Sequence, residues 1–319
     1  MGNAALVNGI VASGKNNAWV SEAVCVVEKC TGLADLKGRQ FRWNGTAWRS
    51  VTLPKAYAGG MVVPASPVSD WIVGAVPVSK SADRDVVLHS PTAKEAWLFG
   101  LTAVGGPSGG TYASHYTGGT WRPVRVPFVG DGASASSSAN VWVSGYLPAD
   151  DGAGVMAFNG RQWRTVPLPP LPSSLVYTGS GNIAAVSPSN VWLEIERTSN
   201  AGDSTPYLLH WTGAKWTSIK IHYGLDDMGG APIAQDGNGG VWLILADIKD
   251  PAHEKVFLLH YLNGAWTRVP VPTTAGYDVL GRVALTWIPG TRSLWAAALE
   301  LSDKSPKSAA KLLILKYGP

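Results

Sequence analysis

Short apolar runs centred on tryptophan recur along the chain, and each follows a short polar turn. Their spacing becomes regular from the middle of the chain onward: 50 residues separate Trp142 from Trp192, 50 separate Trp192 from Trp242, and 53 separate Trp242 from Trp295. A fixed period of this length indicates an internal structural repeat. Because no helical periodicity lies between the runs, we read them as β-strands. The seven members are Trp19, Trp71, Trp97, Trp142, Trp192, Trp242 and Trp295.

A second marker follows most of these runs and consists of an aromatic residue, four intervening residues and a tryptophan. Asn-Gly or Thr-Gly within several copies is a hairpin signal, because these residues accept the backbone angles of a tight turn. A truncated copy stands at Tyr317 near the end of the sequence. The complete copies begin and end at Trp43 and Trp48, Tyr116 and Trp121, Phe158 and Trp163, Trp211 and Trp216, and Tyr261 and Trp266.

The repeat around Trp192 shows what one period contains. We expect strands over residues 182–187, 191–196, 207–211 and 215–220, with a polar loop over residues 197–206. Four short antiparallel strands in each period of about fifty residues is the pattern of a β-propeller blade. The sequence therefore predicts an all-β fold, a single β-propeller domain over residues 1–319.

The number of blades depends on residues 60–126. Trp71 and Trp97 lie only 26 residues apart and share one aromatic marker, so one blade lacks an outer hairpin or another has an extra one. Counting one blade for each tryptophan-centred run predicts seven blades, with six as the alternative. The last repeat stops after Tyr317, and we expect residues 4–7 to pair there as the missing strand and close the ring.

The best-preserved repeat resembles the secreted β-propeller repeats of actinobacteria. Residues 187–192 read Ser-Pro-Ser-Asn-Val-Trp and residues 210–213 read His-Trp-Thr-Gly, close to the two motifs of those repeats. Weaker copies cover nearly the whole chain, and residues 60–110 depart most. The resemblance implies the propeller fold and says little about function, because one fold carries many functions.

Composition and charge narrow the function classes. Hydrophobic residues make up 45% of the chain and charged residues 15%, and no run of eighteen uncharged apolar residues predicts a membrane span. The net charge of +4 is spread along the chain without a Lys/Arg run, so we expect no nucleic-acid partner. We also expect no cofactor, no metal and a monomeric protein.

The two cysteines, Cys25 and Cys30, are separated by four residues. This spacing suits neither a zinc site nor the Cys-x-x-Cys redox motif. We expect a small-loop disulfide, with two unpaired thiols as the alternative. A disulfide implies an oxidising compartment and hence a secreted or cell-surface protein. Residues 1–12 carry no signal-peptide pattern, so we expect any such peptide to lie outside this sequence.

The repeat explains most of the residues that would otherwise suggest a binding site. Fourteen of the fifteen tryptophans occupy repeat positions and are expected in blade cores. Only Trp287 falls outside them, and it could face the central channel. His115, His210 and His260 share one repeat position, where we expect a structural hydrogen bond to a neighbouring turn. The stretch from Asp236 is expected to be a plain turn rather than a calcium loop.

One segment between two blades combines several groups with functional chemistry. His222, Tyr223, Asp226 and Asp227 lie within six residues, between the last strand of one blade and the first of the next. Such a cluster can bind a cation or a sugar, or supply acid–base groups. The alternative is an ordinary solvated loop, since Asp and Gly are common in turns.

Two carboxylates lie on one face of a predicted strand. Glu194 and Glu196 are two residues apart, so both side chains point the same way. They could pair with Arg197 or with a cation of an adjacent blade, or project into a groove. An enzyme would bring Glu194 and the 222–227 residues together with Tyr277, Arg282 or Trp287 in one pocket.

These observations leave three hypotheses for function. The first is a recognition or scaffold propeller outside the cytoplasm, binding a glycan, protein or small molecule through loops around the channel. The alternative is a hydrolase, lyase or cyclase with its site at the channel mouth. The sequence carries no nucleophile elbow, phosphate loop or dinucleotide motif to identify such an enzyme. A third reading, an assembly module, predicts an exposed apolar patch.

Overall fold

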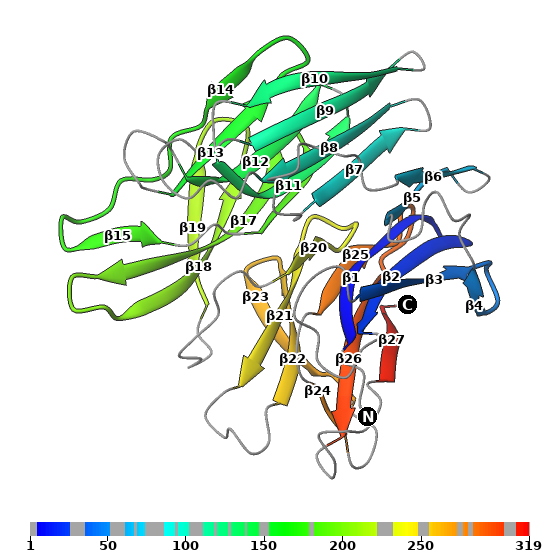
Figure 1. Cartoon of the computed structure of the whole chain (residues 1–319). Coiled ribbons are helices and arrows are strands. Elements are labelled where there is room, and N and C mark those ends of the chain that lie inside the picture. The colour runs from blue at the N-terminus through cyan, green and yellow to red at the C-terminus, as the bar shows by residue number, and fades with distance from the viewer. Residues whose placement is uncertain are drawn as a thin grey trace. The chain divides into compact units, whose positions relative to one another are not determined.

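The computed structural model of the chain places strands β1 to β27 (Figure 1). Among the residues it describes there is no helix, and so none long and apolar enough to cross a membrane. The described residues are 5–25, 36–51, 61–66, 69–73, 86–92, 95–101, 111–117, 120–126, 129–137, 139–146, 153–178, 182–221, 232–247, 255–272, 277–279, 283–302 and 311–318.

The chain forms two compact units, Met1–Val76 with Ala234–Pro319, and Pro77–Ile233. The single-domain expectation stays a prediction. The first unit holds β1 (Ala5–Gly14), β2 (Asn17–Cys25), β3 (Leu36–Trp43), β4 (Trp48–Val51), β5 (Met61–Ser66), β6 (Ser69–Val73), β21 (Val241–Asp247), β22 (Lys255–Leu262), β23 (Ala265–Pro270), β24 (Tyr277–Val279), β25 (Ala284–Trp287), β26 (Leu294–Ser302) and β27 (Lys311–Tyr317).

The second unit also consists of strands, and β20 (Ile233–Gln235) lies across the boundary between the two units. Its strands are β7 (Val86–Thr92), β8 (Glu95–Leu101), β9 (Thr111–Thr117), β10 (Thr120–Val126), β11 (Val129–Ser137), β12 (Asn140–Tyr146), β13 (Ala153–Phe158), β14 (Trp163–Thr165), β15 (Leu175–Thr178), β16 (Ile183–Ser187), β17 (Asn190–Ser199), β18 (Ser204–Trp211) and β19 (Trp216–Lys220).

The fold is an all-β propeller of four-stranded antiparallel blades, as the sequence predicts. In β1–β4, β7–β10, β11–β14 and β20–β23 each strand pairs with the next one along the chain. We call these positions the first to fourth rank of a blade. The tryptophan-centred runs form the second rank, and the aromatic markers join the third rank to the fourth.

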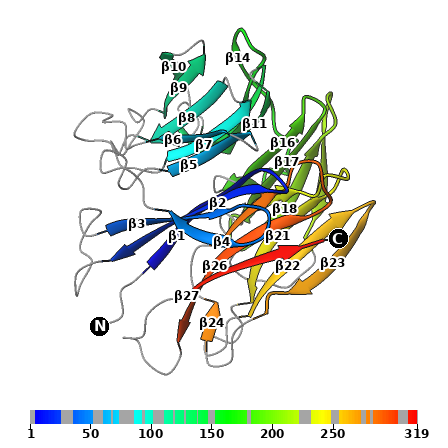
Figure 2. The same ribbon diagram turned by 90° about the vertical axis from the view of Figure 1, so that its right-hand side faces the viewer.

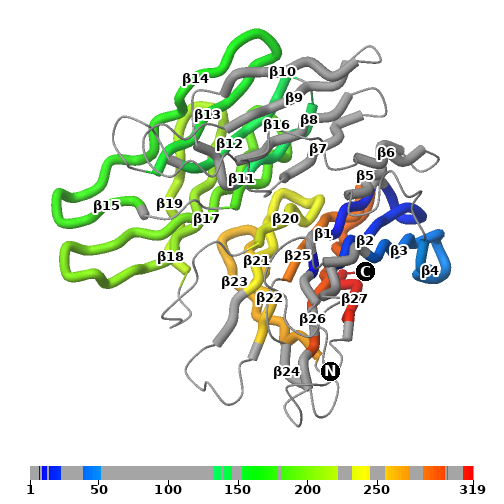
Figure 3. Tube along the Cα trace, in the orientation of Figure 1, coloured from blue at the N-terminus to red at the C-terminus, as the bar shows by residue number. Residues whose placement is uncertain are grey.

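The β15–β19 sheet has five strands because its first rank is split. β15 pairs with the end of β17, from Leu175 opposite Ser199 to Thr178 opposite Glu196. β16 pairs with the beginning of the same strand (Figure 3). The last sheet repeats this arrangement, since β24 and β25 pair with successive parts of β26. β27 lies along the other side of β26 (Figure 2).

The predicted number of blades needs correction. Instead of seven or six, five blades have four ranks: β1–β4, β7–β10, β11–β14, β15–β19 and β20–β23. Within the described residues β5 and β6 form a two-stranded sheet, and β24–β27 fill the first three ranks only. Each tryptophan-centred run marks a hairpin of first- and second-rank strands. Such a hairpin forms whether or not third- and fourth-rank strands complete the blade, so counting the runs gives too many complete blades.

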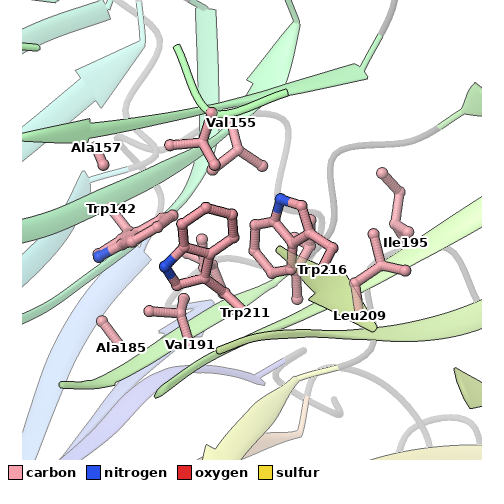
Figure 4. Close-up of a cluster of buried hydrophobic side chains, with 12 residues drawn as sticks. Trp142, Val155, Ala157, Ala185, Val191, Ile195, Leu209, Trp211 and Trp216 are labelled. Carbon is pink, nitrogen blue, oxygen red and sulfur yellow. The ribbon is translucent and has the colours of Figure 1, made fainter. Parts of the chain in front are cut away.

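The core between β11–β14 and β15–β19 is built around Trp142, which is 1% exposed. Its ring centroid lies 5.8 Å from that of Trp211 and 6.1 Å from that of Trp216 (Figure 4). The second-rank tryptophan of one blade therefore packs against the marker pair of the following blade. This confirms the blade-core role predicted for these tryptophans, because large aromatic rings bury the most apolar area per residue.

The same arrangement joins the last sheet to the first. The Trp295 ring lies 5.2 Å from Trp43 and 5.3 Å from Trp48, centroid to centroid. The β1–β4 blade thus packs against β24–β27 as a following blade would. The expectation that residues 4–7 supply the missing strand of the last blade is wrong. Ala5 and Val7 pair instead with Val24 and Glu22 inside the first blade, where β1 is the first-rank strand.

Candidate functional site

Most of the residues that the sequence singles out for function fall outside the described residues. They therefore stay predictions. Tyr277 is the first residue of β24 and Cys25 the last of β2, while their predicted companions Arg282 and Cys30 are not described. The other residues not described are His222, Tyr223, Asp226 and Asp227.

Glu194 and Glu196 lie in β17, on one face as predicted. Glu194 is completely buried, and the positions that align with it in β12 and β21 carry Ser144 and Ile244. Its carboxylate therefore has no direct access to solvent, so a dissolved ligand does not reach it in this conformation. Arg197 points to the opposite face of the strand, because side chains alternate along β17.

Trp287 ends β25 and lies beside the turn of the neighbouring blade. Its indole N–H donates to the Thr291 carbonyl oxygen at 2.8 Å. A side chain at Gly237, in the turn that begins at Asp236, would meet the Trp287 ring. The contact explains this tryptophan as a packing residue between two blades of the first unit.

Two of the three histidines at the repeat position, His210 and His260, make the structural hydrogen bond predicted for them, and for His115 it stays a prediction. His210 Nε2 lies 2.9 Å from Asn190 Oδ1, and His260 Nε2 lies 2.8 Å from Asp236 Oδ2. Asp236 Oδ1 also accepts hydrogen bonds from two backbone amides of its own turn. The turn is therefore held by its own backbone and by the histidine. Within the described stretches no three His, Cys, Asp or Glu side chains gather closely enough to hold a metal ion.

The hairpin of β17 and β18 is longer than the sequence predicts. Residues 197–206 were expected to form a loop, yet pairing continues to Thr198 opposite Ser204. A hydrogen bond of 2.7 Å between these two side chains and another from the Ser199 amide to the Asp203 carbonyl hold the tip. Arg197 is therefore fixed in a strand, with Tyr177 of β15 directly opposite it.

Arg197 lies between two tyrosines on one face of this blade. Its guanidinium carbon is 3.7 Å from the centroid of the Tyr207 ring and 5.5 Å from that of Tyr177. Its Nη2 donates to Ser218 Oγ at 2.6 Å and, more weakly, to the Tyr177 hydroxyl at 3.5 Å. The Tyr177 hydroxyl donates in turn to the Pro169 carbonyl at 3.0 Å. We call Arg197, Tyr177, Tyr207 and Ser218 the Arg197 cluster.

The guanidinium of Arg197 contacts the rings of Tyr177 and Tyr207 and the hydroxyls of Tyr177 and Ser218. Within the described residues it forms no ion pair, and its buried Nε has no hydrogen-bond partner there. Arg39 is different, because it makes a two-pronged ion pair with the buried Glu22, with N–O distances of 2.8 and 3.0 Å. Burial raises the pKa of Tyr177, and the charge of Arg197 partly opposes this rise. The tyrosine therefore stays a neutral hydrogen-bond partner at physiological pH.

The Arg197 cluster stands at the end of the blade from which the predicted 222–227 loop departs. Tyr207, near the start of β18, is opposite Lys220, the last residue of β19. Both Lys220 and Ser218 are exposed. The chain continues from Ile221 into the segment that begins with His222, so the described cluster and the predicted loop originate at the same blade end.

Sequence reasoning missed this cluster because it placed Arg197 in a loop and considered it only as a partner for the two glutamates. The signal available in the sequence was the alternation of side chains between the two faces of the strand. Ile195 and Arg197 share one face, and Tyr207 pairs with Ile195. Extending the strand pairing by two residues would have placed Arg197 beside that tyrosine.

The chain matches no protein-family model, and none of the curated proteins compared with it matches either. Several solved structures share its fold. An ulvan lyase of a polysaccharide lyase family, solved bound to GlcA(1-4)Rha3S, has 10% sequence identity and a TM-score of 0.53, and the match covers 98% of this chain and 96% of that one. A Hadza microbial sialidase has 13% identity and a TM-score of 0.53, covering 98% and 66%.

A leech intramolecular trans-sialidase has 12% identity and a TM-score of 0.52, and the match covers 99% of this chain and 68% of that one. At these identities the likeness concerns the fold alone. It supports the predicted β-propeller. Membership of the actinobacterial repeat family stays a prediction.

Proposed function

We propose that the protein is an extracytoplasmic recognition propeller that binds a glycan carrying an anionic group at the loop end of its blades. The observation that carries this proposal is the Arg197 cluster. It is a guanidinium packed on tyrosine rings, without an ion pair in the described structure, at a blade end with exposed Ser218 and Lys220. The disulfide expected between Cys25 and Cys30, and the resemblance to secreted repeats, agree with a place outside the cytoplasm.

The chemistry of the cluster favours an anionic sugar. A guanidinium presents a planar set of N–H donors that matches a carboxylate or sulfate, and ring packing holds it in one orientation before a ligand arrives. Tyrosine and serine hydroxyls add hydrogen bonds of the kind that sugar hydroxyls use. The names of the three similar proteins concern carbohydrate chemistry, and one of them was solved with a sugar containing GlcA and Rha3S.

A glycan array with neutral, carboxylated and sulfated members tests the proposal. We expect the protein to retain anionic members, and Arg197→Lys to weaken binding at least tenfold, because lysine cannot make the planar contact. Arg268→Lys is the matched control, since Arg268 lies 3.3 Å above the Phe257 ring in another blade. An array without binding, or equal loss from both variants, would overturn the proposal.

An enzyme of the same fold is the second candidate. The observation in its favour is that His222, Tyr223, Asp226 and Asp227 follow β19 from the blade end that holds the Arg197 cluster. Incubation with acidic oligosaccharides, followed by mass spectrometry of the products, distinguishes the two functions. Cleavage that is lost in His222→Ala or Asp226→Asn establishes an enzyme, whereas binding of intact oligosaccharide establishes a recognition protein.

A further inference from the structure

β27 has one free side within the described structure. It pairs with β26 as a third-rank strand, and none of the other described strands pairs with its outer side. In the five complete blades this position is filled by β4, β10, β14, β19 or β23. Within the described residues, the last sheet therefore ends on the outer backbone N–H and C=O groups of β27. In the complete blades, a fourth-rank strand pairs with the corresponding groups.

Two side chains of β27 are also less buried than the side chains at the same positions of the third-rank strands β18 and β22. Alignment on the second-rank tryptophans places Ile314 and Leu315 where β18 has Leu208 and Leu209 and β22 has Leu258 and Leu259. These four leucines are completely buried, whereas Ile314 and Leu315 are only partly buried. The difference is what removal of a fourth-rank strand from a blade would produce.

The complete blades show which side chains cover this position. In β19, Trp216 is opposite Trp211 and Ile219 is opposite Leu208. In β23, Trp266 is opposite Tyr261 and Val269 is opposite Leu258. The covering strand thus carries an aromatic residue and, three positions later, an aliphatic one.

Lys316 indicates how a strand added beside β27 would differ from the fourth-rank strands of the complete blades. It is exposed and takes the place that His210 and His260 hold in other blades, where the opposing residue is Thr217 or Thr267. A lysine next to an incoming strand favours a carboxylate opposite it, since opposite charges on directly paired positions attract.

We propose that the outer side of β27 binds an extended segment of a partner protein, which adds antiparallel as a fourth-rank strand. Its sequence pattern is aromatic, acidic, any residue, aliphatic, placed opposite Tyr317, Lys316, Leu315 and Ile314. Strand addition of this kind gains affinity from backbone hydrogen bonds and specificity from alternate side chains. A second copy of β27 does not fit, because Gly and Pro follow its only aromatic residue. The inference does not depend on the proposed glycan function.

The backbone register says which amides the added strand engages. The Val166 amide donates to the Val155 carbonyl, and the Val271 amide to the Val256 carbonyl, at 2.8 and 3.1 Å. By the same alignment, the backbone groups of Leu312, Ile314 and Lys316 point outward in β27. Those of Leu313 and Leu315 point to β26, because the direction alternates along an antiparallel strand.

A fluorescent peptide containing Trp-Glu-Ser-Ile tests the proposal on the full chain. We expect saturable binding by anisotropy, and at least tenfold slower hydrogen exchange at Leu312, Ile314 and Lys316, with Leu313 and Leu315 unchanged. The matched peptide Trp-Lys-Ser-Ile is expected to bind about fivefold more weakly. Lys316→Glu should reverse that preference, and it changes only an exposed side chain.

Three results would overturn the proposal. The first is the absence of peptide binding, and the second is binding that leaves the three outward amides unprotected. The third is slow exchange of those amides in the free protein, since that would mean that the chain itself already covers β27. Glycan binding is measured separately with Arg197→Lys, so failure of one proposal leaves the other intact.

Discussion

The Trp192 indole and the His210 imidazole lie parallel on paired positions of β17 and β18, with ring centroids 3.8 Å apart and planes 6° apart. Trp242 and His260 repeat this stack at 4.0 Å and 6°. The two blades differ in the turn residue that meets the histidine, which is Asn190 in one and Asp236 in the other. The protein thus contains a neutral and an acidic version of the same arrangement.

Acid should weaken the fold through His210. Burial lowers the pKa of His210 below its ordinary value of 6.5, so the folded state favours the neutral ring. The stability contributed by this group is present above pH 6.5 and is lost as the pH falls below it. Asn190→Asp supplies a carboxylate that stabilises the protonated ring, and we expect it to reduce the loss by about 1 kcal/mol. Urea unfolding at pH 7.5 and 5.5 measures this change, and an unchanged pH dependence would contradict it.

Trp295 should be as important for stability as Trp142. Both are buried second-rank tryptophans packed against a marker pair, so either change to alanine leaves a large cavity and should cost about 3–5 kcal/mol. Trp163→Ala is the control, because Trp163 is partly exposed, and a smaller loss is expected. Guanidinium unfolding compares the three variants. A loss for Trp295→Ala no larger than that for Trp163→Ala would show that the first and last sheets are not coupled by this contact.

Gly237 and Gly239 form a matched pair within one turn. Both have positive φ, 71° and 92°, so alanine at either position costs about 1–2 kcal/mol of backbone strain. Only at Gly237 does the added methyl group also meet the Trp287 ring and the Thr291 carbonyl. We therefore expect Gly237→Ala to lower the melting temperature clearly more than Gly239→Ala. Equal effects would contradict the packing described for Trp287.

Tyr317→Phe should stabilise the protein. The Tyr317 hydroxyl is buried and has no hydrogen-bond partner within the described structure, so its removal should gain about 1 kcal/mol. Burial raises the pKa of Tyr317 from 10.0 to about 12, so the folded state favours the neutral phenol. This contribution is present below pH 10 and is lost as the pH rises toward 12. The variant should lose less stability than the natural protein between pH 9 and 11 in urea unfolding, and a destabilised variant would contradict the prediction.

The cysteine pairing can be settled by mass. If Cys25 and Cys30 form the small-loop disulfide that the sequence predicts, protein purified without reductant should be 2 Da lighter than its reduced form and should resist alkylation. Protein expressed under reducing conditions is the control. Alkylation of both thiols in oxidised protein would remove this support for a place outside the cytoplasm.

The sequence predicts the parts of the fold that depend on local pattern. The second-rank strands, the marker hairpins and the role of His210 follow from alternation, turn residues and recurrence. The split first rank of β15 and β16 does not, because the sequence predicts a first strand over residues 182–187 alone, and only pairing with β17 reveals that Leu175–Thr178 shares its rank. Arg197 was missed for a related reason, since a polar strand end in a hairpin has the composition of a loop.

Trp295 packed between Trp43 and Trp48 also bears on the order of events during synthesis. The β1–β4 blade leaves the ribosome before the strand that carries Trp295, with the whole Pro77–Ile233 unit between them. The indoles of Trp43 and Trp48 therefore lack their native contact with Trp295 until that later strand has been made. Contacts between residues so far apart in sequence form slowly. A chaperone that binds exposed aromatic surface would find its target on the β1–β4 blade of the nascent chain.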